Sequence, residues 1–290
     1  MHPFQYVSPK TINEVVSTLS EYGERARCLA GGTDVLVQTR TGRYNLDAIV
    51  DVKSVPELMS FTLDSSGLSF GAAVPCYQLY EDRKVSSAYP GIIDSASIIG
   101  GIQIQSRASL GGNLCNASPS ADGIPALIVH HAVARVVGPS GNRDILVEDF
   151  CTGPGTTILN SNEILVSLHL PSPSENFGAA YQRFIPRNEM DIAVAGAGSS
   201  VEIDPGSDRI ISARIALAAV GPKPIFATTA SKSLEGQLIT DNLLEEAGKL
   251  AASEASPIDD MRGTAKHRSQ LVKVLVQRTL AKAINRAREQ

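Results

Sequence analysis

The chain has 290 residues, with 43% hydrophobic and 19% charged side chains, a formal net charge of −4 and a pI of about 5.8. This length suffices for two domains, and the balance of apolar and charged residues excludes a disordered chain. The acidic balance disfavours nucleic acid as a partner, because proteins that bind a polyanion present a positive field. We also expect a cytoplasmic protein without a membrane span. The amino end lacks the apolar core of a signal peptide, and no stretch approaches the roughly 18–20 apolar residues that cross a bilayer.

The first predicted elements are a helix, a strand, a glycine loop and a short helix. Residues 11–22 carry apolar side chains at the spacing of one helical face, and Thr11 with Glu14 predicts a capping box. Residues 28–30 form a short apolar run that predicts a strand ending in Gly31-Gly32. The following Thr33-Asp34 is a candidate cap for a turn of helix.

Strands and helices alternate through the middle of the chain. Apolar runs predict buried strands at residues 48–52 and 68–72, and helical spacing predicts a helix over residues 88–99. Residues 102–105, Ile-Gln-Ile-Gln, alternate apolar and polar side chains, so we expect them to be extended. A second glycine-rich loop covers residues 109–122. Beyond it, the predicted elements are a helix over residues 124–129 and strands over residues 133–137 and 163–170.

The segment PSPSEN, residues 171–176, has the composition of a linker, and we place a domain boundary near it. Strand-like segments at residues 192–201 and 210–220 then precede a long helical carboxyl end that starts at Leu243. Residues 267–288 predict an amphipathic helix with a solvated basic face rather than a helix that binds nucleic acid.

No metal site is expected in this chain. Zinc and iron–sulfur sites bring their ligands in close pairs, whereas the cysteines here lie tens of residues apart and are expected to be small buried hydrophobes. The four are Cys28, Cys76, Cys115 and Cys151. Adjacent helical residues point about 100° apart, so His130-His131 is interpreted as a helix-end cap or surface pair. Asp259-Asp260 is interpreted as an exposed loop pair.

Two glycine pairs, Gly31-Gly32 and Gly111-Gly112, are the clearest chemical signals. Paired glycines let backbone N–H groups approach an anion, although a single pair is more often a plain tight turn. Two pairs roughly 80 residues apart, each followed by a small polar residue (Thr33 and Asn113), favour one extended pyrophosphate held from both sides. That arrangement suits a dinucleotide. The pattern is neither G-x-G-x-x-G nor G-x-x-x-x-G-K-[ST], so the Rossmann and P-loop modes are unsupported.

These segments resemble the flavin subunits of the molybdenum hydroxylases, which include xanthine, nicotinate and carbon monoxide dehydrogenases. Residues 29–36, LAGGTDVL, are similar to the family's first flavin loop, and residues 109–113 with Ala117-Ser118-Pro119 and Asp122 are similar to its second. The similarity continues in three further places, Glu163-Ile164-Leu165, Arg183 with Asp191-Ile192-Ala193, and Met261-Arg262-Gly263 with Arg268.

The resemblance implies an α+β fold with two domains. Residues 1–175 would form a two-lobed FAD-binding domain of the PCMH (vanillyl-alcohol-oxidase-like) type, with subdomains of about 1–55 and 56–175. Residues 176–290 would form a smaller α+β carboxyl-terminal domain of the CO dehydrogenase flavoprotein type.

The resemblance also implies which residues contact FAD. The two glycine segments would hold its pyrophosphate and ribityl parts, and Asp122 its adenosine side or ribityl chain. Leu165 and Ile192 would pack near the isoalloxazine, with Ile99 on a neighbouring wall, and Arg183 would lie near the polar edge of the ring. The full set is Leu29, Ala30, Gly31, Gly32, Thr33, Asp34, Val35, Leu36, Ile99, Ser109, Leu110, Gly111, Gly112, Asn113, Asp122, Leu165, Arg183 and Ile192.

Several of these residues have ordinary structural explanations when the family is set aside. Leu165, Ile192 and Ile99 would then be simple core, and Asp122 a helix cap. From the resemblance we would expect lysine in many relatives at the position of Arg183, and a planar guanidinium is not interchangeable with a point charge.

The function that the resemblance implies is electron transfer, with no catalytic side chain in this chain. A large subunit with a molybdenum–pterin cofactor would oxidise the substrate, and a small subunit with [2Fe–2S] clusters would relay electrons to FAD here. FAD would pass them to NAD⁺, a quinone or another acceptor, in an α₂β₂γ₂ assembly. The cysteine spacing excludes the extra four-iron cluster of some relatives. Residues 148–155 and Glu163-Ile164-Leu165 most resemble xanthine-dehydrogenase-like flavin subunits, which implies purines or other N-heterocycles as substrates.

Two alternatives remain at this point. The first is a self-contained FAD-dependent oxidoreductase, such as a cell-wall precursor reductase or an aryl-alcohol oxidase, which would need its own catalytic acid. The second is a scaffold that has the fold without the flavin, which the two glycine pairs argue against.

Overall fold

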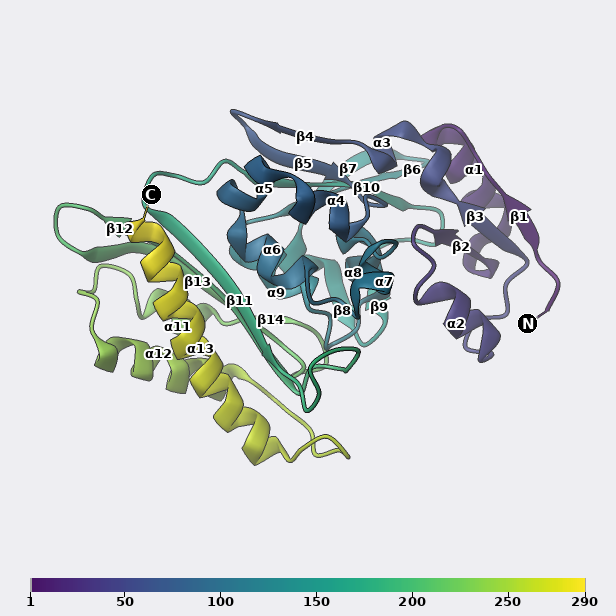
Figure 1. Cartoon of the computed structure of the whole chain (residues 1–290). Coiled ribbons are helices and arrows are strands. Elements are labelled where there is room, and N and C mark those ends of the chain that lie inside the picture. Colours follow the sequence, from purple (N-terminus) through teal and green to yellow (C-terminus); the bar gives the residue numbers. More distant parts are fainter. Residues whose placement is uncertain (1, 290) are drawn as a thin grey trace.

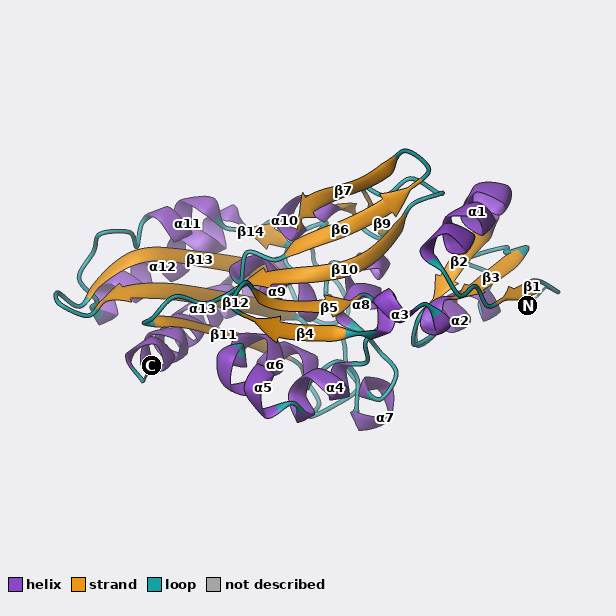
Figure 2. Cartoon of the chain, turned by 90° about the horizontal axis from the view of Figure 1, so that it is seen from above, coloured by secondary structure: helices purple, strands orange, loops and turns teal. Residues whose placement is uncertain are grey.

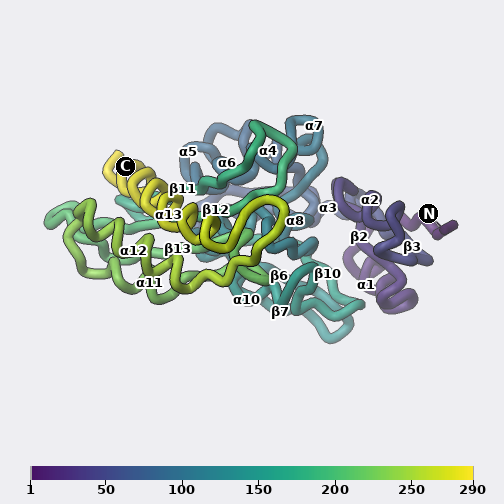
Figure 3. The backbone as a smooth tube through the Cα atoms, turned by 90° about the horizontal axis from the view of Figure 1, so that it is seen from below, coloured from purple at the N-terminus to yellow at the C-terminus, as the bar shows by residue number. Residues whose placement is uncertain are grey.

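The computed structural model describes residues 2–289, and its three main sheets follow one another along the molecule (Figures 1–3). A three-stranded parallel sheet has the order β1-β3-β2, a five-stranded antiparallel sheet the order β4-β5-β10-β6-β7, and a four-stranded antiparallel sheet the order β11-β12-β13-β14. β8 and β9 form a small hairpin.

The strands are β1 (Gln5–Val7), β2 (Ala26–Leu29), β3 (Ala48–Asp51), β4 (Phe61–Asp64), β5 (Gly67–Gly71), β6 (Val133–Gly138), β7 (Gly141–Leu146), β8 (Cys151–Gly153), β9 (Thr156–Thr157), β10 (Ile164–Pro171), β11 (Phe177–Phe184), β12 (Ala195–Asp204), β13 (Arg209–Ala218) and β14 (Ile225–Phe226). The helices are α1 (Ile12–Tyr22), α2 (Val35–Arg40), α3 (Pro56–Met59), α4 (Cys76–Glu81), α5 (Arg83–Ala88), α6 (Pro90–Ala96), α7 (Ile102–Gln105), α8 (Leu110–Asn116), α9 (Gly123–Val129), α10 (Val147–Phe150), α11 (Thr228–Lys232), α12 (Asp241–Glu254) and α13 (Ala265–Arg288), with 3₁₀ turns η1 (Gly23–Arg25) and η2 (Val52–Ser54).

The first lobe forms as its local sequence predicts. The Thr11 hydroxyl accepts the Glu14 N–H at 3.2 Å, and the Glu14 carboxylate accepts the N–H of Lys10 at 2.7 Å. These two reciprocal bonds cap the N-terminus of α1. Val15 and Leu19, on the apolar face of α1, are buried in the main core. The predicted order of helix, strand, glycine loop and short helix is therefore confirmed by α1, by β2 leading into Gly31-Gly32, and by α2.

Two predictions in the middle of the chain are wrong. Ile102–Gln105 is the helix α7 rather than an extended segment. The amide of Gln105 turns inward, donating to the Ser97 carbonyl at 2.8 Å and accepting from Tyr80 at 3.2 Å, while Ile102 is exposed. Four alternating residues fit one helical turn as well as a strand, so the pattern was too short to decide. The second glycine segment is likewise helix, because α8 starts at Leu110 with Ser109 as its N-cap.

The five-stranded sheet and its helices make up the largest core. β10 is the central strand, and α4, α5 and α6 lie beside the sheet (Figure 2). Every residue of α9 is buried, and α9 also contacts β12 and β13 of the third sheet. The second and third sheets therefore share a packed boundary rather than being joined only by the segment between β10 and β11.

The third sheet carries the long helix α13 across its β11 and β12 strands (Figure 1). The basic face of α13 is only partly solvated, so the prediction of a solvated basic face over residues 267–288 is wrong in part. Arg268 is buried, and Arg286 donates to the carboxylate of Asp94 on α6 at 2.6 Å and 3.0 Å. Lys282 donates to the same carboxylate at 2.9 Å. These ion pairs fix the carboxyl-terminal helix to the central lobe. Within residues 2–289, no helix is both long and apolar enough to cross a membrane.

Candidate functional site

A cleft of about 670 Å³ lies where the first lobe, the central lobe and the start of the third sheet meet. Of the eighteen residues that the sequence assigned to FAD contact, fifteen line this cleft. They are Ala30, Gly31, Gly32, Thr33, Asp34, Val35, Ile99, Ser109, Gly111, Gly112, Asn113, Asp122, Leu165, Arg183 and Ile192. Leu29, Leu36 and Leu110 do not line it; Leu29 and Leu110 are buried core residues and Leu36 is partly exposed.

The two glycine segments lie against each other, although they are far apart in the sequence. A Cβ on Gly31 would overlap the backbone carbonyl of Arg107, just before the second segment. Arg107 in turn donates from its Nε to the Gly31 carbonyl at 3.2 Å. Only glycine permits this approach, so Gly31 sets the spacing between the two walls of the cleft.

The second glycine segment, Gly111-Gly112, is packed equally closely against the backbone that follows β5. A Cβ on Gly111 would overlap the backbone of Ala72, at the end of β5. The Ser109 hydroxyl accepts the Gly112 N–H at 3.0 Å, which caps α8. The N–H group of Gly111 precedes the first intrahelical bond of α8, as do those of Thr33 and Asp34 before α2. All three residues line the cleft, so these N–H groups are the candidate donors for a phosphate.

Polar side chains on this wall hold one another. The Asn113 amide oxygen accepts the Gly123 N–H at 3.0 Å, which ties α8 to α9.

Asp122 accepts the Tyr181 hydroxyl at 2.8 Å through one oxygen and Arg183 through the other. Asp122 makes no cap bond to α9, so the ordinary explanation as a helix cap is wrong. Burial raises the pKa of the Asp122 carboxyl, and the Arg183 charge opposes that shift. Burial and the neighbouring Asp122 raise the pKa of Tyr181 well above its usual value, so its phenol stays a proton donor.

Apolar side chains line another part of the cleft. Leu165 lies on β10 where the pairing with β6 is interrupted by a bulge. Ile99 follows α6, and Ile192 lies in the loop between β11 and β12 with half of its surface exposed. Ile192 is therefore not simple core, whereas Leu165 is both buried and a lining residue.

Sequence reasoning missed residues that chain folding brings to this cleft. Two arginines lie over the ring of Tyr44, with the guanidinium carbons of Arg27 and Arg43 at 4.7 Å and 5.7 Å from the ring centroid. Tyr44 and Arg27 line the cleft, as do Cys28 and Cys115. Cys115 is exposed and Cys28 half-buried, so the expectation of buried cysteines is wrong for Cys115. No short motif marks these positions, because they come from separate elements.

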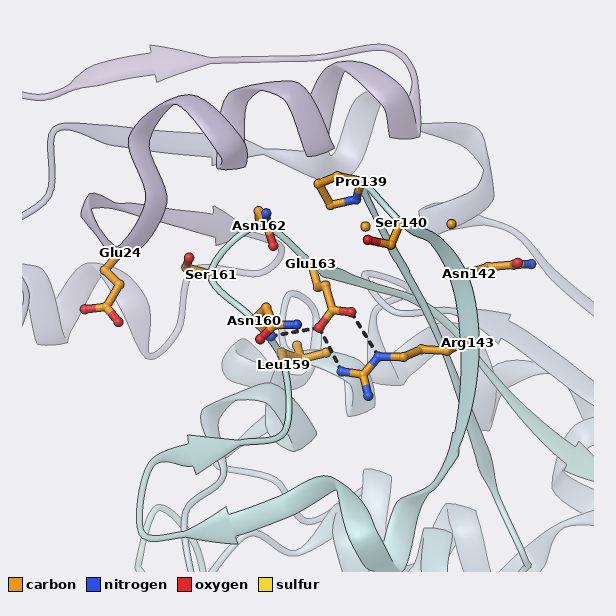
Figure 4. A pocket seen from close by; sticks show the side chains of 12 residues that line it. Glu24, Pro139, Ser140, Asn142, Arg143, Leu159, Asn160, Ser161, Asn162 and Glu163 are labelled. Carbon is orange, nitrogen blue, oxygen red and sulfur yellow. Dashed lines mark hydrogen bonds and ion pairs between the residues drawn. The ribbon is translucent and has the colours of Figure 1, made fainter.

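A second, polar cavity of about 650 Å³ adjoins the cleft (Figure 4). Arg143 reaches across from β7 and forms two bonds of 2.9 Å and 2.8 Å with Glu163, whose carboxylate also accepts the Asn160 N–H at 2.8 Å. This ion pair and hydrogen bond hold the pKa of Glu163 below its usual value. Glu163 therefore anchors the loop before β10 and, indirectly, the position of Leu165.

The remaining candidates lie outside the cleft. His130 caps the end of α9 but is buried rather than on the surface, which corrects the expectation of a surface pair. Asp259 and Asp260 are exposed, and Asp260 accepts from the buried Arg268 at 2.6 Å. In the part of the chain that the structure describes, no cluster of three or more His, Cys, Asp or Glu could hold a metal ion.

The cleft fits FAD on three counts. Its two glycine segments form a cradle that a Cβ would fill, with backbone donors suited to a pyrophosphate. Its apolar walls suit a flat ring system. Its lining also includes the buried, planar guanidinium of Arg183, which the ion pair with Asp122 holds beside those walls.

Comparison with known proteins gives the family. Residues 2–173 match the FAD binding domain in molybdopterin dehydrogenase, and residues 179–283 match the CO dehydrogenase flavoprotein C-terminal domain. The chain is 30% identical over 281 residues to a xanthine dehydrogenase FAD-binding subunit from Escherichia coli O157:H7, covering 96% of this chain and 95% of that protein. It is 29% identical over 286 residues to the carbon monoxide dehydrogenase medium chain of Afipia carboxidovorans, covering 98% of each. The fold matches a carbon monoxide dehydrogenase from Hydrogenophaga pseudoflava with a TM-score of 0.94 and 27% identity over 99% of both chains.

These matches confirm the α+β fold with an FAD-binding domain and a carboxyl-terminal domain, and they confirm FAD as the cofactor. Both relatives named above are subunits of dehydrogenases, so this chain is a subunit of an oxidoreductase complex. The chain belongs to the molybdenum hydroxylase family as its FAD-binding medium subunit, of the xanthine dehydrogenase and carbon monoxide dehydrogenase type.

Proposed function

We propose that this subunit collects electrons in FAD from the [2Fe–2S] clusters of a small partner subunit and passes them to NAD⁺, a quinone or another acceptor. A large partner subunit with a molybdenum–pterin cofactor would oxidise the substrate, in an α₂β₂γ₂ assembly in the cytoplasm. The observation that carries the proposal is a cleft whose lining suits a cofactor and whose Asp122 and Arg183 side chains neutralise each other in an ion pair. Both oxygens of Asp122 are bonded, so this carboxylate is held by Tyr181 and Arg183 rather than free to act as an acid.

The side chains would then bind and orient FAD rather than transfer protons to a substrate. Residues 30–34 and 109–113 would hold the pyrophosphate and ribityl parts through backbone N–H groups. Ile99, Leu165 and Ile192 would pack on the ring, with Arg183 at its polar edge. Leu29 and Leu110 would support these segments from behind the lining, and the partly exposed Leu36 lies beside Gly32.

The domain limits of the proposal are residues 1–175 for the FAD-binding domain, with subdomains of about 1–55 and 56–175, and residues 176–290 for the carboxyl-terminal domain. Support comes from the sheets, since each of these three parts contains one of the three main sheets. The proposed substrates of the complex are purines or other N-heterocycles. Support for that class is the similarity to a protein named as a xanthine dehydrogenase subunit.

The test compares the isolated, FAD-loaded chain with the complete complex under anaerobic conditions. An N-heterocyclic substrate such as xanthine should bleach the flavin absorption only in the complex. In the isolated chain, the flavin should stay oxidised until reduced iron–sulfur subunit is added. If the isolated chain oxidises a small substrate unaided, it is a self-contained flavoenzyme and the proposal is wrong. If the complex reduces its iron–sulfur clusters but never its flavin, the electron path is wrong.

A further inference from the structure

We propose that Arg268 is a positioning residue, which holds the loop at the ring end of the FAD cleft from within the carboxyl-terminal domain. Arg268 lies in the first turn of α13, and its side chain is only 4% exposed. It does not line the cleft in the described structure, so any effect on the flavin must act through the residues that it binds.

The guanidinium of Arg268 joins three separate segments. Its Nη1 donates to the carbonyl of Val194 at 2.7 Å and to the carbonyl of Ala219 at 3.1 Å. Its Nη2 donates to the carboxylate of Asp260 at 2.6 Å. One side chain therefore fixes the loop before β12, the turn after β13 and the loop before α13.

Two of these segments lead directly to the cleft. Val194 is the last residue before β12, and the three residues before it, Asp191, Ile192 and Ala193, all line the cleft. The Ala219 N–H donates to the carbonyl of Pro119 at 2.6 Å, next to the lining residues Ser118 and Ser120. Arg268 thus bonds the residue next to one wall of the cleft and reaches the other wall through Ala219 and Pro119.

The loop needs such a support because its own backbone is irregular. Met190 in this loop has a φ angle of 54°, and Ala219 in the turn after β13 has one of 64°, a region in which residues other than glycine are strained. The backbone bond from the Val194 N–H to the Phe184 carbonyl, at 2.9 Å, holds only the base of the loop. Three charge-assisted bonds from a planar, permanently charged group fix its position further.

Arginine suits this position better than lysine does. A guanidinium presents donors in one rigid plane and cannot be deprotonated when buried, whereas an ammonium is a point charge. The nearby Asp260 supplies the countercharge. Its carboxylate is also held by the Arg262 N–H at 2.8 Å, so the pair is built into the loop.

The inference rests on the proposed placement of the flavin ring against Ile192, and its test uses the full FAD-loaded chain. The variants are Arg268→Lys and Arg268→Gln, and the matched control is Lys266→Gln, an exposed cation in the same helical turn. The readouts are amide hydrogen exchange of residues 190–194, the visible circular dichroism of the flavin and the dissociation constant of FAD.

We expect Arg268→Gln to raise the exchange rate of residues 190–194 about tenfold and to change the flavin dichroism, because charge-assisted bonds are lost. Arg268→Lys keeps the charge but not the planar fork, so it should change both readouts in the same direction and less strongly. Lys266→Gln should behave like the wild type. Wild-type exchange and dichroism in both Arg268 variants would overturn the inference.

Two further variants keep the test decisive. If Arg268→Gln fails to fold, Asp260→Asn removes only the countercharge from an exposed loop and should shift both readouts in the same direction, less strongly. Unchanged readouts in that variant would count against the inference. Ile192→Trp tests the ring placement separately. If it perturbs the flavin while the Arg268 variants do not, the positioning role alone is wrong; if it leaves the flavin unperturbed, the ring placement is wrong.

Discussion

Asp122 and Arg183 form an ion pair between residues 61 positions apart, and each side chain is less than one tenth exposed. The pair joins the start of α9 to β11, and so joins the central lobe to the third sheet at the cleft. The Tyr181 hydroxyl completes it with a bond of 2.8 Å to Asp122.

Asp122→Asn should lower the free energy of unfolding by about 3 kcal/mol, because it leaves the buried guanidinium of Arg183 without a countercharge. Chemical denaturation of the variant measures this directly. The control is Asp144→Asn, which breaks the exposed ion pair with Arg135 and should cost less than about 1 kcal/mol. If both substitutions lower the free energy of unfolding equally, the buried ion pair contributes no more to stability than the exposed one.

Gly31→Ala and Gly111→Ala should each weaken FAD binding by at least about tenfold, because the added methyl group forces apart segments that are in backbone contact. Titration of the apoprotein with FAD measures the dissociation constant. Gly206→Ala is the control, since a Cβ at that exposed turn meets only ordinary van der Waals contact. If both cleft variants bind FAD with wild-type affinity, the glycine segments are plain turns.

The chain contains no tryptophan, so one introduced indole gives a clean reporter of the flavin position. Ile192→Trp should quench the fluorescence of bound flavin strongly, because the indole would stack against the ring. Ile211→Trp, at an equally exposed position on β13, is the matched control and should leave flavin emission close to wild type. Equal quenching by both variants would contradict the placement of the ring at Ile192.

His130 should make the fold sensitive to acid. Burial lowers the pKa of His130 from 6.5 to about 4, and Ala126 accepts from its Nδ1 at 2.8 Å. The unfolded chain therefore takes up a proton at a higher pH than the folded chain does. The stability contributed by neutral His130 is complete above pH 6.5 and is lost as the pH falls toward 4.

The expected loss is up to about 1.4 kcal/mol per pH unit within that window. Denaturation of the wild type and of His130→Asn at several pH values measures it, and the carboxylates common to both proteins cancel in the difference. A difference that stays constant from pH 7 to about pH 4 would contradict the neutral, buried state of this histidine.

Local signals account for the parts of the fold that the sequence predicted. The cap of α1, the strand before Gly31 and the glycine pairs each depend on residues a few positions apart, so a pattern within one segment is sufficient. α7 was mistaken because four alternating residues carry too little information to separate a helical turn from a strand.

The rest of the site depends on contacts between distant segments, which one sequence does not reveal. Asp122 was expected to contact the cofactor or cap a helix, yet its partners come from β11. Arg268 was placed on a solvated helical face, yet it is buried against Val194, 74 positions away. The contacts of Arg27 and Arg43 with the Tyr44 ring have no sequence signature for the same reason.

The most direct test of the account is the visible spectrum of the chain, purified with whatever co-purifies, followed by acid release and identification of the chromophore. The account predicts flavin absorption bands with FAD as the released compound, and additional broad absorption when an iron–sulfur partner is retained. A colourless chain that takes up no added FAD would contradict it.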